Sequence, residues 1–167
     1  MADDPTPDID EASDPRPAHG GSFVPKAFVP PNPPRTDSFW LEPLGPEHNE
    51  ADYAAWTSSM EHIHATPGFE SKRWPHPMTL EENAGDLREH ADHFVRLVGF
   101  TYTVRSSTDG DVIGCVYIYP SADAAVDASV RSWVRASHAQ LDAELWSVVT
   151  HWLQGAWPFG TVEYATR

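Results

Sequence analysis

The chain has 167 residues, and its 11 lysines and arginines against 25 aspartates and glutamates give a formal net charge of −14. This acidity argues against unaided binding to nucleic acid, which needs clustered cations, and against docking on an anionic membrane surface. The single cysteine, Cys115, cannot form an internal disulfide, and the acidic N-terminus lacks the apolar core of a secretion signal. We therefore expect a cytoplasmic protein.

Residues 1–37 differ in composition from the rest of the chain. They hold 9 of the 16 prolines and few large apolar side chains, so they cannot build a core of their own. We predict a proline-rich, extended and non-catalytic arm over 1–37, followed by one domain over 38–167. The apolar segment Phe23–Val29 is suited to docking in a groove of that domain.

The first part of the domain predicts one strand and two helices. Residues 39–44 alternate like a strand, and Pro46 opens a helix with apolar residues on one face. Thr79 and Glu82 form the capping box of a second helix, which we expect to end at Gly99.

The second part predicts strands around one further helix. Asp109 and Gly110 mark a hairpin, and Gly114 indicates a bulge or a close backbone approach. The expected elements are strands over 100–106, 112–119, 128–135 and 161–167, and a helix that begins near Asp142.

This β-α-α-β-β-β-α-β order resembles the GCN5-related N-acetyltransferase (GNAT) superfamily over roughly residues 38–167. Three features carry the resemblance: the run from Asp111 to Ser121, a following strand that ends in Ser-Trp-Val-Arg-Ala, and the helix directly after that strand. It implies an α+β fold in which helices flank a central, mostly antiparallel sheet. The chain looks like a shortened and degenerate member that lacks the last strands of the family.

The resemblance implies acetyl-CoA as a cosubstrate. In the family, the pantetheine arm pairs with the edge of the fourth strand, and the pyrophosphate lies on the loop and helix N-terminus that follow. Unpaired N–H groups and the positive end of the helix bind the phosphates there. The corresponding residues here are Trp133, Val134, Arg135, His138, Ala139, Gln140, Asp142 and Ala143.

The sequence departs from the family at this junction, because no glycine lies between Val134 and Val149. Asp142 could cap the helix itself, and its charge would repel a phosphate by ~1 kcal/mol per charge pair in water. Arg135 and His138 could partly compensate this charge. The sequence leaves open whether the coenzyme site is altered or lost.

The catalytic groups of the family are incomplete in this chain. Related enzymes often place a glutamate on the fourth strand as general base, and the best match here is Ser129. Tyr164 does not match the tyrosine that serves many of them as general acid. Positioning an amine against a thioester supplies much of the rate enhancement, so the missing groups do not exclude transfer.

The loop between the first two helices is a candidate acceptor site. It contains Lys72, Arg73, Trp74 and His76, and the corresponding link covers the acceptor in the resembled family. The alternative is a rigid, proline-fixed loop with Trp74 in the core.

We expect no bound metal. His62 and His64 point in different directions on a helix. His90 and His93 are suitably spaced, but we expect them on a solvated face opposite the apolar stripe of their helix.

Two functions remain open. The first is acetyl-CoA-dependent N-acetylation of a small amine or a peptide N-terminus. The second is a non-catalytic GNAT-like binding or dimerisation module that has lost coenzyme binding. An open wedge beside residues 133–135 favours the enzyme, and a wedge filled by side chains or by the arm favours the module. We also expect the sheet edge at 161–167 to be covered by the arm or by a second subunit in a homodimer.

Overall fold

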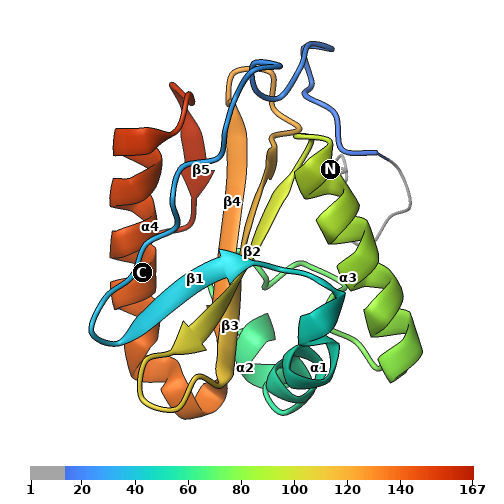
Figure 1. The fold of residues 1–167 in the computed structure, drawn as a ribbon, viewed down its shortest axis with the longest axis vertical. Helices are drawn as coiled ribbons and strands as arrows, with labels where there is room; N and C mark the ends of the chain where they lie inside the picture. Colours follow the sequence, from blue (N-terminus) through green and yellow to red (C-terminus); the bar gives the residue numbers. More distant parts are fainter. Residues whose placement is uncertain (1–13) are drawn as a thin grey trace.

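The computed structural model describes residues 14–167, which form a five-stranded sheet with helices on both sides (Figure 1). The strand order is β1-β2-β3-β4-β5, antiparallel between successive strands except for the parallel pair β4 and β5. The predicted α+β, mostly antiparallel architecture is confirmed. The elements are β1 (Phe39–Pro43), η1 (Pro46–His48), α1 (Asn49–Thr57), α2 (Met60–His64), α3 (Leu80–Val95), β2 (Phe100–Ser106), β3 (Val112–Pro120), β4 (Ala128–Val134), η2 (Ala136–Leu141), α4 (Asp142–Ala156) and β5 (Val162–Tyr164).

Two apolar clusters form because residues alternate between the two faces of each strand. One cluster joins the sheet to α4 and the arm, and includes Phe100, Val130 and Leu145. The other joins it to α1, α2 and the 65–79 loop, and includes Trp56 and Trp133. Within residues 14–167, no helix is long and apolar enough to cross a bilayer.

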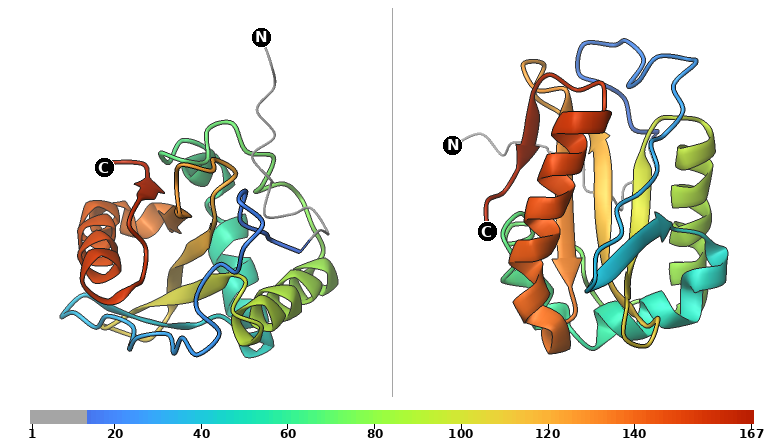
Figure 2. Two further views of the ribbon diagram at one scale, coloured as in Figure 1. Left: turned by 90° about the horizontal axis from the view of Figure 1, so that it is seen from above. Right: turned by 60° about the vertical axis from the view of Figure 1, so that its left-hand side comes forward.

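The described part of the arm, residues 14–37, lies on the domain. It crosses the face between α4 and α3 (Figure 2). The Phe23 ring stacks on Phe159 at a centroid distance of 5.0 Å, and the Phe28 ring lies 5.3 Å from Trp157. The docking predicted for Phe23–Val29 is therefore observed through Phe23, Val24 and Phe28, and the other residues of this segment are exposed. The first 13 residues of the predicted 1–37 arm lie outside the described residues.

Two glycines have different roles. A side chain at Gly114 would place its Cβ 2.2 Å from the Trp133 carbonyl oxygen. The pairing of β2 with β3 shifts register between Val104 and Arg105, opposite Gly114. The predicted close approach and bulge are both confirmed. The prediction that Gly99 ends the second helix was wrong, because α3 stops at Val95. Gly99 instead makes room for the Tyr119 ring, which a Cβ would overlap.

Candidate functional site

The edge of β4 next to α4 is the candidate site, because β4 and β5 separate there. Their parallel pairing covers only Ala128–Val130 of β4, although β4 continues to Val134. The chain then turns through η2 directly into α4. This leaves a wedge bounded by β4, the β5 end and the first turn of α4.

Arg167 occupies this wedge. Its Nε donates to Asp142 Oδ2 at 2.6 Å, and its Nη2 donates to the Ser132 carbonyl at 2.8 Å. Only 4% of the Arg167 side chain is exposed, against 20% of that of Asp142. The hydroxyls of Ser132 and Tyr164 are also bonded to each other, at 2.5 Å. Side chains thus fill the gap, and an ion pair covers the β4 edge.

Asp142 has a different role from the one expected. It is the first residue of α4, Leu141 is the N-cap, and no side chain caps this helix end. The expectation that Asp142 caps the helix was therefore wrong, because its carboxylate turns to Arg167 instead. Its other oxygen, Oδ1, is buried without a hydrogen-bond partner among residues 14–167.

The other predicted coenzyme residues are spread over different environments. Trp133 is fully buried and donates to the Tyr117 hydroxyl at 3.0 Å, and Val134 is also buried. Arg135 reaches the Val112 carbonyl and the Ser58 hydroxyl, both at 3.5 Å, so it extends towards the turn between α1 and α2. The remaining residues lie on the exposed or half-buried surface of η2 and early α4: His138, Ala139, Gln140 and Ala143.

The predicted acceptor loop also contains both buried and exposed residues. Trp74 lies in the core, and the centroid of its ring is 5.8 Å from that of Trp56 and 6.0 Å from that of Trp133. This position agrees with the alternative prediction of a rigid loop with Trp74 in the core. Lys72 and His76 are half-buried, and Arg73 is exposed. Their role in acceptor recognition stays a prediction.

Ser129 is half-buried on β4 and faces Tyr119 of β3 in the sheet register. Within residues 14–167, no group of three or more histidine, cysteine or acidic side chains could hold a metal ion. Cys115 is buried, and burial raises the pKa of its thiol, which leaves it a packing residue.

The positions of His90 and His93 overturn one expectation. His93 is buried, and His90 contacts Tyr119 and Thr101, so the prediction of a solvated face was wrong. His90 follows Leu87 by three residues and precedes Phe94 by four, which places it on the buried face of α3. Helical spacing alone could have indicated this.

Sequence reasoning also missed Arg167, in the wedge, and Asp52, a buried carboxylate on α1. The indication for Arg167 was a cation at the end of the last predicted strand, 161–167, in an acidic chain. The indication for Asp52 was a carboxylate four residues before Trp56, on the buried face of the helix.

No protein-family profile and no curated protein matches this sequence. Solved structures do match its fold. A ribosomal-protein-S5-alanine acetyltransferase from Vibrio fischeri aligns with a TM-score of 0.59 and 13% identity, over 75% of this chain and 69% of that one. RimL, a ribosomal alpha-N-protein acetyltransferase in complex with coenzyme A, gives 0.56 and 15%, over 73% and 68%.

The microcin C7 self-immunity acetyltransferase MccE, in complex with acetyl-CoA and AMP, gives a TM-score of 0.53 at 12% identity. The alignment covers 71% of this chain and 62% of that one. At these identities the likeness establishes the fold, which is that of the GNAT acetyltransferases.

Proposed function

We propose that the protein transfers an acetyl group from acetyl-CoA to a primary amine of a small molecule or a peptide N-terminus. The observation that carries this proposal is the separation of β4 from β5 beside the first turn of α4, in a fold shared with acetyltransferases. RimL and MccE were solved with coenzyme A and acetyl-CoA respectively, which supports the same cosubstrate here.

Under this proposal, Arg167 leaves the Ser132 carbonyl when the coenzyme binds. A pantetheine amide N–H could not donate to that carbonyl oxygen while the guanidinium holds it at 2.8 Å. The amine then attacks the thioester carbonyl carbon, the C–S bond breaks, and the sulfur leaves as a thiolate that takes a proton.

The filled wedge supports a second candidate, the non-catalytic binding or dimerisation module. Arg167 and Asp142 together occupy the β4 edge and the helix end on which a coenzyme would depend. In that case the fold presents surfaces to a partner, and β5, the last strand of the sheet order, is a candidate edge for a homodimer.

Calorimetric titration of acetyl-CoA separates the two functions. We expect micromolar binding by the wild type and tighter binding by Arg167→Ala, since the coenzyme no longer has to displace the guanidinium. Glu50→Gln on the exposed side of α1 is the matched control and should bind like the wild type. Absence of binding by the wild type and by both Arg167→Ala and Asp142→Gly would contradict the enzyme and support the module.

A further inference from the structure

A small polar cavity lies on the face of the sheet opposite α4. It has a volume of about 20 Å³, enough for one water-sized group. An ammonium group is close to water in size, whereas a larger head group would not fit. The residues used below line it from α1, the 65–79 loop, α3 and β3: Asp52, Trp74, Asn83, His90 and Tyr117.

Asp52 gives this cavity a buried acidic group. Only 4% of the residue is exposed, and its contacts are with two neutral donors. Asn83 Nδ2 donates to Oδ2 at 3.1 Å, and the Cys115 thiol lies 3.9 Å from Oδ1. Burial raises the pKa of Asp52 to about 6 despite the Asn83 bond and the nearby His48. A cation in the cavity would therefore relieve a costly buried charge.

Aromatic rings complete the walls of the cavity. The Trp74 and Tyr117 rings are 6.3 Å apart between centroids, and Trp74 also packs on Trp56. Aromatic faces attract cations, most strongly where water is excluded. The cavity thus combines a carboxylate with aromatic walls, which is chemistry suited to a small cation.

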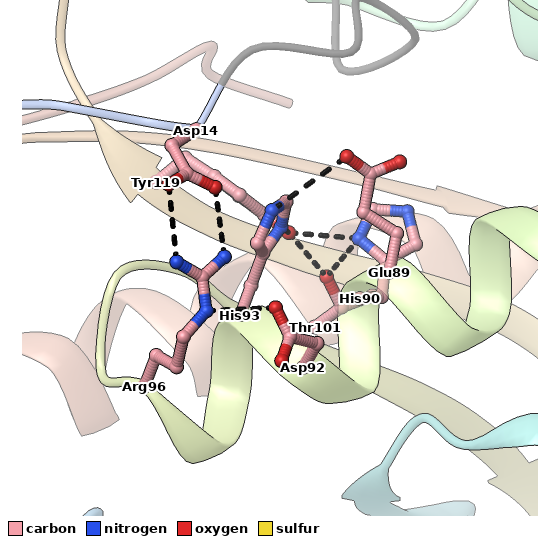
Figure 3. A network of polar contacts seen from close by, with 8 residues as sticks. All are labelled: Asp14, Glu89, His90, Asp92, His93, Arg96, Thr101 and Tyr119. Carbon is pink, nitrogen blue, oxygen red and sulfur yellow. Dashed lines mark hydrogen bonds and ion pairs between the residues drawn. The ribbon is translucent and has the colours of Figure 1, made fainter.

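Two hydrogen bonds and one ion-pair contact lead from His90 to the surface (Figure 3). His90 lines the cavity, and its Nδ1 lies 2.7 Å from the Tyr119 hydroxyl. That hydroxyl lies 3.1 Å from His93 Nδ1, and His93 Nε2 lies 3.8 Å from Glu89, which is 44% exposed. Since Nδ1 of His90 is bonded to Tyr119, its Nε2 is the ring nitrogen left for the cavity.

We propose that this cavity binds the primary ammonium group of the acceptor, with Asp52 as its counter-charge. The His90–Tyr119–His93 chain then carries one ammonium proton to solvent near Glu89. This inference rests on the proposed function and identifies where its acceptor amine would be held and deprotonated.

The proton transfer balances along the chain. An ammonium N–H bond breaks as a bond forms to His90 Nε2, and the Nδ1 proton of His90 passes to the Tyr119 oxygen. The Tyr119 hydroxyl proton passes to His93 Nδ1, and the Nε2 proton of His93 leaves to Glu89 or water. The acceptor is left as a neutral amine whose lone pair can attack a carbonyl carbon.

The ammonium site is tested with methylammonium chloride as the probe, by calorimetry on the full chain without coenzyme. We expect millimolar binding by the wild type, at least tenfold weaker binding by Asp52→Asn, and unchanged binding by Glu50→Gln on the same helix. Sodium chloride and methanol should give no binding. Equal affinity of Asp52→Asn and wild type, or no binding by the wild type, overturns the site whatever the result with acetyl-CoA.

The proton chain is tested by nuclear magnetic resonance of the imidazole nitrogens. Methylammonium should change the ring signals of both His90 and His93 in the wild type. In Tyr119→Phe, which keeps the cavity lining, it should change those of His90 alone. An equal change at His93 in that variant overturns the chain, and thermal melting of each variant verifies that it is folded.

Discussion

We expect the ion pair between Arg167 and Asp142 to contribute measurably to the free energy of unfolding. Arg167→Ala leaves the Asp142 carboxylate in a site where only 20% of its side chain is exposed. Removing one partner of a buried pair costs about 3–5 kcal/mol. The partial exposure of Asp142 favours the lower end, so we expect a loss of about 3 kcal/mol. In a domain of this size that corresponds to a fall of about 6–12 °C in Tm.

A double-mutant cycle identifies the source of this loss. Arg167→Ala combined with Asp142→Asn should recover part of the stability, because no unpaired charge remains. Urea unfolding of the wild type, the two single variants and the double variant gives the coupling free energy. Arg96→Ala, which breaks exposed ion pairs with Asp14 and Asp92, is the control and should lose far less. A fall in Tm below about 2 °C for Arg167→Ala, or a double variant no more stable than that single variant, would refute the reasoning.

Three further predictions concern groups away from the wedge. The pKa of Asp52 is raised from an ordinary 3.8 to about 6 in the folded protein. Between these two pH values the folded protein therefore holds a proton on Asp52 that the unfolded chain has released. Stability relative to Asp52→Asn should therefore fall by about 3 kcal/mol as pH rises from 4 to 7, and a constant difference in urea unfolding would contradict this. Phe28→Ala should cost about 2–3 kcal/mol by removing the contact with Trp157, measured by thermal unfolding against an exposed control, Val29→Ala. The buried Cys115 thiol should react with Ellman's reagent only after denaturation, and rapid reaction of the native protein would contradict its burial.

Local sequence patterns determined most of the elements of this fold. The Thr79–Glu82 capping box, the Asp109-Gly110 turn and the close approach at Gly114 each follow from interactions within a few residues or from backbone geometry. Alternating and helical apolar patterns gave the element order, from which the GNAT resemblance followed. The structure and the solved acetyltransferases confirm that fold.

The contents of the candidate site were decided by tertiary structure. Arg167 and Asp142 are 25 residues apart and meet only because β5 returns beside β4. The His90–Tyr119 bond likewise joins α3 to β3 across 29 residues. Sequence periodicity reports which face of an element is buried, but long-range pairing decides which polar groups meet there. A carboxylate that reads as a helix cap in the sequence is therefore an ion-pair partner in the folded chain.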